Sequence, residues 1–137
     1  VKIPVIGNGD IATGEDVARR KLETAVSGLM IGRAAMQNPW VFRQAKHYLE
    51  TGETLPCVPL EERWALVLRH CRLAVDSVRY GAERHAMMSM RARLMAYCKG
   101  FPGAKELRQR LARVESVAEV EDIAAASMAA AEDMAAA

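Results

Sequence analysis

Two short apolar runs, each closed by glycine, open the chain. Residues 2–6 (KIPVI) are followed by Gly7, and residues 28–32 (GLMIG) end in glycine. Both runs are typical of buried parallel strands. The stretch between them, TGEDVARRKLE, is typical of a helix, with Thr13 as N-cap, acidic residues in the first turn and basic residues near the end. A strand, a helix and a strand within about 30 residues predict a right-handed βαβ unit.

Helical periodicity governs the rest of the chain. One helix is expected to start with Pro39 at its first position and to stop at Gly52. Prolines in the linker TGETLPCVP then interrupt both helix and strand patterns, so we place a domain boundary there, between residues 1–55 and 56–137. Four further helices are expected, over residues 60–80, 83–99, 103–113 and 117–134. The predicted fold is therefore α/β followed by an all-α helical bundle.

Composition narrows the class of protein. Apolar residues make up 51% of the 137 positions and charged residues 26%, which indicates a folded chain rather than a disordered one. No charged-then-apolar leader and no run of 18 apolar residues occur, so we expect a cytoplasmic protein without a membrane partner. The three cysteines form no CxxC pair, and we expect packing thiols and no metal site. They are Cys57, Cys71 and Cys98.

The net charge of +2 hides an uneven distribution. Residues 1–55 carry 7 basic and 6 acidic side chains, residues 56–113 carry 12 and 5, and residues 114–137 carry none and 6. A local basic excess attracts phosphate groups and favours a nucleic-acid-binding surface. A solvated, arginine-rich helix face would give the same count, so charge alone leaves both interpretations open.

The residues after each predicted strand are suited to bind an anion. These clusters are Gly7-Asn8-Gly9-Asp10 and Gly32-Arg33. Glycines let backbone N–H groups approach a ligand closely, and an arginine adds a bidentate donor fork. Taken alone, the first cluster is more simply a tight turn and Arg33 a surface ion pair. Together, at consecutive strand ends, they predict a phosphate site like the one that (β/α)₈ barrels form after their last two strands.

The order of these motifs resembles a known family. IPVIGNGDI, GLMIGRAAMQNPWVF and YLETGE are similar to the end of the catalytic barrel of tRNA-dihydrouridine synthases, and MRARLMAYCKGFPGAKELR is similar to their C-terminal helical domain. The resemblance implies the last βα units of a TIM (β/α)₈ barrel followed by a helical tRNA-binding domain. Because the chain starts inside a predicted strand, we expect a fragment of a longer protein.

The resemblance also implies a site for FMN. The residues that match the family's phosphate-binding segments are Asn8, Gly9, Asp10, Gly32 and Arg33, with Gly7 as a turn residue beside them. The carboxylate of Asp10 would repel a phosphate, so its main chain is expected to contribute, or its side chain to cap the following helix. The segment Asn38-Pro39-Trp40 with Phe42 is interpreted as packing.

In the family, NADPH reduces FMN, the flavin reduces uridine in tRNA to 5,6-dihydrouridine, and a cysteine supplies the proton. That cysteine is expected upstream of this chain, because none of the three cysteines here matches it. The fragment is thus expected to hold no catalytic residue and to be inactive alone, and the full-length protein is expected to be a monomer.

The basic helical region is expected to contact tRNA. The matching positions are Arg91, Lys99 and Arg108, with Arg93 as a weaker candidate. Compared with the family pattern MRKHLAWYLKG, this chain has Ala92, Arg93 and Ala96 in place of Lys, His and Trp. Two other functions stay open: an FMN-dependent barrel oxidoreductase acting on a small metabolite, and a non-catalytic RNA-binding module.

Overall fold

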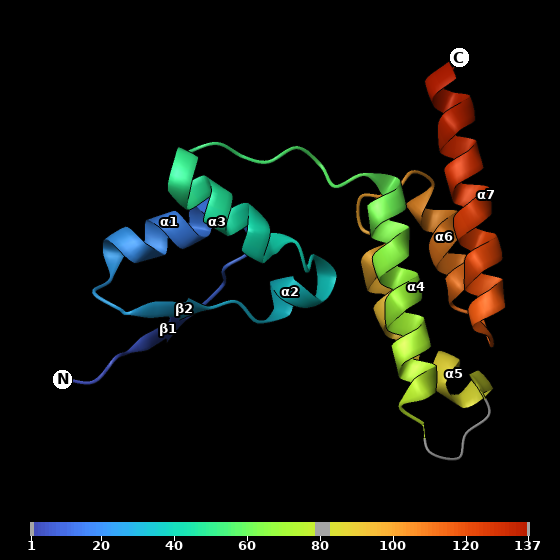
Figure 1. The fold of residues 1–137 in the computed structure, drawn as a ribbon, viewed down its shortest axis with the longest axis horizontal. Coiled ribbons are helices and arrows are strands. Elements are labelled where there is room, and N and C mark those ends of the chain that lie inside the picture. Colours follow the sequence, from blue (N-terminus) through green and yellow to red (C-terminus); the bar gives the residue numbers. More distant parts are fainter. Residues whose placement is uncertain (1, 79–82, 137) are drawn as a thin grey trace. The chain divides into compact units, whose positions relative to one another are not determined.

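The computed structural model describes residues 2–78 and 83–136 of the chain. The chain forms two compact units, one up to Cys57 and one from Val58 onward. Figure 1 shows that the first unit combines two strands with three helices, and that the second has only helices among its described residues. The division lies two residues beyond the boundary placed from the linker sequence.

The first unit is a βαβ unit followed by two further helices. Its elements are β1 (Ile6–Asn8), α1 (Gly14–Glu23), β2 (Gly28–Met30), α2 (Arg33–Gln37) and α3 (Val41–Thr51). The strands pair in parallel with Gly7 opposite Leu29, so the βαβ prediction is confirmed. Helices α1 and α3 pack against each other, and a small core of Ile11, Val17 and Ala45 forms here.

Both strands differ in position from the prediction. β1 begins at Ile6 rather than Lys2, because only the residues from Ile6 onward pair with β2. Gly7 therefore lies within the strand, and its expected place in a turn is wrong. A Cβ on Gly7 would stand 3.2 Å from Leu29 Cδ2, so close packing favours glycine here. β2 ends at Met30, which leaves Gly32 in the loop that follows.

A capping box fixes the start of α1. The hydroxyl of Thr13 accepts a hydrogen bond from the N–H of Asp16 at 3.1 Å, and the Asp16 carboxylate accepts one from the N–H of Thr13 at 3.1 Å. Thr13 is thus the N-cap that the sequence predicted. The expectation that the Asp10 side chain caps this helix is wrong, because Thr13 is the N-cap and Asp10 instead pairs with Arg33.

The segment after β2 departs from the prediction at its start. The short helix α2 was not predicted, and α3 begins at Val41 with Trp40 as N-cap, so Pro39 is not at the first helical position. Gly52 ends α3 with φ of 75°, as predicted. Phe42, expected to pack, is 55% exposed in this unit, because α3 buries Val41 and Ala45 instead.

The second unit is a bundle of four helices. They are α4 (Leu60–Asp76), α5 (Glu83–Tyr97), α6 (Ala104–Leu111) and α7 (Val117–Ala136). α4 packs against α5 and α7, and α6 packs against the same two helices. The four predicted helices are confirmed with shifted ends: α4 stops at Asp76 rather than residue 80, and the predicted break at Tyr80-Gly81 lies outside the described residues.

One hydrophobic core holds this bundle together. Its fully buried side chains include Trp64, Met87, Met90, Leu94 and Leu111. The rings of Trp64 and Phe101 meet edge to face with centroids 5.2 Å apart, so residues from α4 and from the α5–α6 connection share the centre of the core.

The cysteines follow the packing prediction in two of three cases. Cys71 and Cys98 are buried in the bundle core, whereas Cys57 is exposed in the linker. Burial raises the pKa of the Cys71 thiol to about 11, and it also raises the pKa of the Cys98 thiol. The two buried thiols therefore stay protonated near neutral pH and serve as packing groups.

Candidate functional site

The loops after the two strands meet around one cavity of about 630 Å³. β1 and β2 run parallel in register, so their carboxyl ends lie at the same edge of the sheet. The cavity is lined by Asn8, Gly9, Asp10, Ile11, Ala12, Met30, Gly32, Arg33, Ala34 and Gln37. The structure thus brings together every predicted phosphate-site residue except Gly7, although the two clusters are more than 20 residues apart in the sequence.

An ion pair joins the two loops. Nη2 of Arg33 donates to Oδ1 of Asp10 at 2.6 Å, and the two side chains are 84% and 88% exposed. The simpler interpretation of Arg33, a surface ion pair, therefore describes its present contact. Its partner, Asp10, is another predicted site residue, and a contact between these two side chains was not predicted.

The cavity has room and donors for a phosphate group. A Cβ placed on Gly32 would meet nothing within 4 Å, so the backbone there is open to a ligand. The guanidinium of Arg33 and the amide of Asn8 are hydrogen-bond donors, and Asp10 is the sole acidic residue in the lining. This donor set fits an anion better than a cation.

A second arginine lies beside the first loop. Nη2 of Arg20, on α1, is 3.8 Å from the position that a Cβ on Gly9 would occupy. The same guanidinium contacts Glu23 at 3.4 Å, while its Nε is buried without a hydrogen bond to a described residue. This proximity could not be predicted, because Arg20 fits the ordinary pattern of basic residues near a helix end.

The four residues predicted to contact RNA lie in three different environments. Lys99 is exposed just after α5, and Arg108 is exposed on α6. The charges of Arg108 and Arg63 act to lower the pKa of the Cys98 thiol, against the larger effect of burial, which is consistent with a place for both near that thiol. Lys99 and Arg108 therefore belong to the same end of the bundle.

Arg91 is engaged within the bundle. Its Nε donates to the carbonyl of Val114 at 3.0 Å, and its Nη2 donates to the carbonyl of Arg113 at 3.1 Å and lies 3.6 Å from Glu115. These contacts tie α5 to the α6–α7 connection. Arg91 therefore has a structural role in the bundle, and its contact with RNA stays a prediction.

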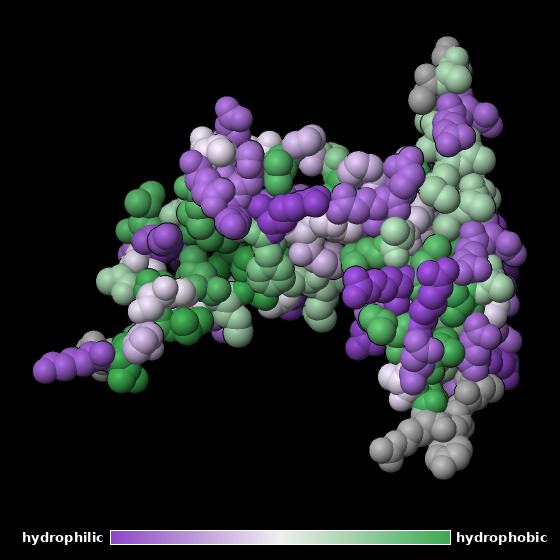
Figure 2. Space-filling model, in the orientation of Figure 1, coloured by the Kyte–Doolittle hydropathy of each residue, from purple (hydrophilic) through white to green (hydrophobic). Residues whose placement is uncertain are grey.

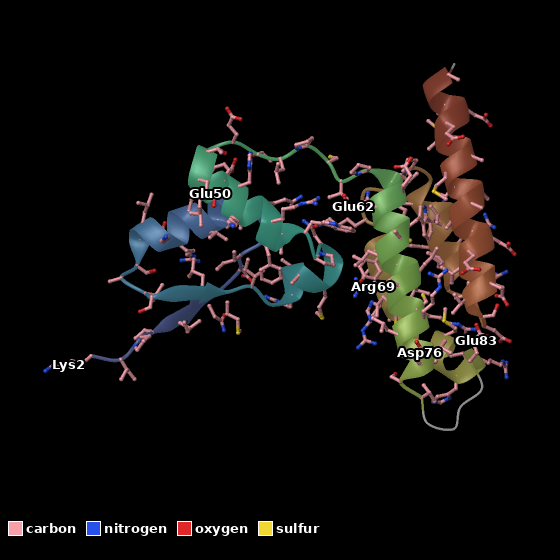
Figure 3. All side chains as sticks on the ribbon, viewed as in Figure 1. Lys2, Glu50, Glu62, Arg69, Asp76 and Glu83 are labelled. Carbon is pink, nitrogen blue, oxygen red and sulfur yellow. The ribbon has the colours of Figure 1, made fainter. Side chains whose placement is uncertain are left out.

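Arg93 is exposed beside a groove between α4 and α5. The groove is lined by His70, Leu73, Ala74, Ser77, Val78, Ser89, Met90 and Arg93. Nδ1 of His70 lies 3.0 Å from the Tyr97 hydroxyl, which fixes the ring between the two helices. Figure 3 labels the exposed Arg69 on α4, one residue before His70, but Arg69 is not among the residues that line the groove.

Burial of the ring, followed by the nearby charge of Arg93, lowers the pKa of His70 below its usual 6.5. The unfolded chain therefore binds this proton at a higher pH than the folded chain does. The stability that neutral His70 contributes is present above pH 6.5 and is lost as the pH falls through the lowered pKa of the folded state.

We expect the urea concentration at the midpoint of bundle unfolding to fall as the pH falls through that window, and His70→Gln to make this fall smaller. An equally steep change in the variant would contradict this.

Arg63 was not identified from the sequence, yet it organises the end of α5. Its Nη1 donates to the carbonyl of Gly100 at 3.0 Å, and its Nη2 donates to the carbonyls of Lys99 at 2.6 Å and Tyr97 at 3.4 Å. The guanidinium also stacks 3.8 Å from the centroid of the Phe101 ring. No local signal could reveal this, because its partners lie 34 to 37 residues further along the chain.

Residues 2–78 and 83–136 hold neither a metal-binding cluster nor a membrane-spanning helix. Within these ranges no three His, Cys, Asp or Glu side chains come close enough to hold a metal ion. No helix in the same part of the chain is long and apolar enough to cross a membrane.

The first unit is a parallel βαβ unit with an anion-compatible cavity at its strand ends, and the second is a helical bundle. The family model described as Dihydrouridine synthase (Dus) matches residues 1–135. The chain therefore belongs to the dihydrouridine synthase family, as the motif order predicted.

Individual relatives agree with the family match. The chain is 41% identical over 115 residues to tRNA-dihydrouridine synthase B of Pseudomonas aeruginosa, covering 84% of this chain and 34% of the relative. It is 44% identical over 116 residues to the protein of the same name from Pseudomonas putida, covering 84% and 33%. A probable tRNA-dihydrouridine synthase of Rickettsia bellii is 34% identical over 122 residues, covering 89% and 36%. The chain spans about a third of the length of these relatives.

Proposed function

We propose that this chain is the C-terminal part of an FMN-dependent enzyme that reduces uridine to 5,6-dihydrouridine in tRNA, with NADPH as reductant. The observation that carries the proposal is the cavity at the two strand ends, which gathers Asn8, Gly9, Asp10, Gly32 and Arg33 in a member of the dihydrouridine synthase family. FMN ends in a phosphate, and the donors of this cavity suit that group.

The exposed surface of the sheet supports the proposal that these two strands are the last strands of a TIM barrel. Parallel strands are normally covered on both faces, yet Val5, Ile6 and Met30 are 41%, 63% and 53% exposed. Figure 2 shows green, apolar side chains gathered along the strands of the first unit. Neighbouring strands of a closed barrel would cover this surface and pair with the open edges of β1 and β2.

The residues of this site would bind the cofactor and would not take part in the chemical step. Arg33 would bind the phosphate end of FMN through charge-assisted hydrogen bonds, and Asn8 together with the backbone at Gly9 and Gly32 would complete the anion site. When bound, the flavin supplies hydride transfer to the uracil ring. The proton donor, a cysteine, would come from a barrel loop upstream, because none of the three cysteines here matches the family's cysteine: Cys57 lies in the linker, and Cys71 and Cys98 are buried in the bundle.

The helical unit would hold the tRNA. Lys99 and Arg108 share one end of the bundle, and Arg93 lies beside the α4–α5 groove. Exposed arginine and lysine side chains contact the phosphates of RNA and make binding dependent on salt. Arg91 is the weakest of the four candidates, because backbone carbonyls and Glu115 already occupy its guanidinium.

The test uses the purified full-length protein. We expect yellow flavin absorbance, salt-dependent binding of unmodified tRNA, and dihydrouridine in that tRNA after incubation with NADPH. Flavin without tRNA affinity would favour an oxidoreductase acting on a small metabolite. Affinity for tRNA without flavin would favour a non-catalytic RNA-binding module.

A further inference from the structure

The ion pair between Asp10 and Arg33 calls for an explanation beyond stability. It joins the loop after β1 to the start of α2, 23 residues apart, at 2.6 Å, yet both side chains are more than four-fifths exposed. Exposed ion pairs contribute little to folding, because water screens them and both side chains lose rotamer freedom. Asp10 also has no role in capping α1, since Thr13 and Asp16 fill that role. What the pair does show is a contact that favours one orientation of a long, flexible arginine.

We propose that Asp10 is a positioning residue that holds the Arg33 guanidinium in place to bind the phosphate of the flavin. This inference rests on the proposed function and adds a role for a side chain that was expected to avoid the phosphate. A guanidinium has five N–H donors in a rigid fork. Asp10 receives a hydrogen bond from Nη2, whereas Nη1 and Nε of Arg33 make no hydrogen bond to a described residue. Those donors are left to bind the ligand.

The geometry of the loops supports this assignment. Asp10 follows β1 and Arg33 is the first residue of α2, so the contact bridges the gap between the two strand ends along the wall of the cavity. Gly32, next to Arg33, leaves open space where a Cβ would stand. A free arginine at this position would have to lose its rotamer freedom upon binding, whereas a held arginine has lost most of it already. The gain in affinity should therefore depend on Arg33 and on the phosphate.

The experiment is a double-mutant cycle in the full-length protein, with FMN and riboflavin as ligands after removal of bound flavin. Riboflavin lacks the phosphate but presents the same ring, so it reports on the fold and on the rest of the flavin site. We expect Asp10→Ala to raise the dissociation constant of FMN by at most about fivefold, and Arg33→Ala to raise it about a hundredfold, with riboflavin affinity unchanged in both. The double variant should bind FMN no more weakly than Arg33→Ala alone, because the two residues act as one unit.

The outcomes separate this inference from the function on which it rests. If Arg33→Ala weakens FMN binding while Asp10→Ala leaves it unchanged or strengthens it, Asp10 does not position the arginine and the inference fails alone. Additive losses in the double variant would also overturn it, because they indicate independent roles. If Arg33→Ala leaves the ratio of FMN to riboflavin affinity unchanged, the phosphate site itself is wrong and both proposals fall. Asp10→Asn, which keeps an acceptor without the charge, should fall between wild type and Asp10→Ala.

Discussion

Trp64→Ala is expected to lower the free energy of unfolding of the helical bundle by about 3–5 kcal/mol, a large fraction of the about 5–15 kcal/mol typical of folded domains. Trp64 is 1% exposed and lies at the centre of the bundle core. Its ring contacts Phe101 edge to face, which joins α4 to the connection between α5 and α6. Removing it would open a large cavity that the surrounding helices can fill only in part.

A second substitution at the same position separates packing from polarity. The indole N–H of Trp64 is buried and finds no acceptor among the described residues. A buried donor without a partner carries a desolvation cost, so Trp64→Phe removes that cost while it keeps most of the ring. We expect Trp64→Phe to lose about 1 kcal/mol, far less than Trp64→Ala.

The measurement is urea unfolding of the chain, monitored by far-ultraviolet circular dichroism. Leu73→Ala is the matched control, because Leu73 is an apolar residue of the same helix that is 56% exposed. We expect it to change the free energy by at most about 0.5 kcal/mol. Equal losses for Trp64→Ala and Leu73→Ala would show that Trp64 is not central to the core.

Periodicity was a sufficient guide to the helical half of the fold. The four helices of the bundle begin within one residue of the predicted positions, because local apolar spacing and glycine or proline breaks decide where such helices start. Strand limits were less predictable. Residues 2–5 have strand-like sequence but form no pairs with β2, and strand structure depends on pairing across the sheet rather than on local preference.

The candidate site was predictable as a set of residues but not as a set of contacts. Glycines and an arginine after consecutive strands were enough to place five residues around one cavity. The ion pair of Asp10 with Arg33 and the contacts of Arg91 with Val114 were not predictable, because each joins segments more than 20 residues apart. Charge counts could not show which arginines are occupied within the bundle. That distinction needs the partner atoms, and for Arg91 they are backbone carbonyls.

Arg63→Ala is the second change with a large expected effect, because one guanidinium satisfies three backbone carbonyls at the end of α5. The last carbonyls of a helix have no partner within the helix, and a positive charge there is favourable. Arg63 supplies donors for Tyr97, Lys99 and Gly100 and stacks on the Phe101 ring. We expect Arg63→Ala to lower the free energy of unfolding of the bundle by about 2–3 kcal/mol.

The arginine fork matters as much as the charge. Arg63→Lys keeps a positive charge but cannot donate to several carbonyls in one plane, so we expect it to lose about half as much stability as Arg63→Ala. Arg69→Ala is the matched control: Arg69 lies on the same helix, is exposed, and has no hydrogen bond or ion pair to a described residue. It should change stability by at most about 0.5 kcal/mol.

The same change should reach the proposed RNA surface. Gly100 has φ of 78°, so the turn after α5 is sharp. Arg63 donates hydrogen bonds to the two successive carbonyls of this turn, those of Lys99 and Gly100. Without Arg63 the turn would lose its fixed path, and Lys99 would no longer lie in a fixed position beside α6. In the full-length protein we therefore expect Arg63→Lys, which stays folded, to weaken tRNA binding at constant salt, whereas Arg69→Lys leaves it unchanged. Loss of stability without loss of tRNA affinity would confine Arg63 to a role in folding.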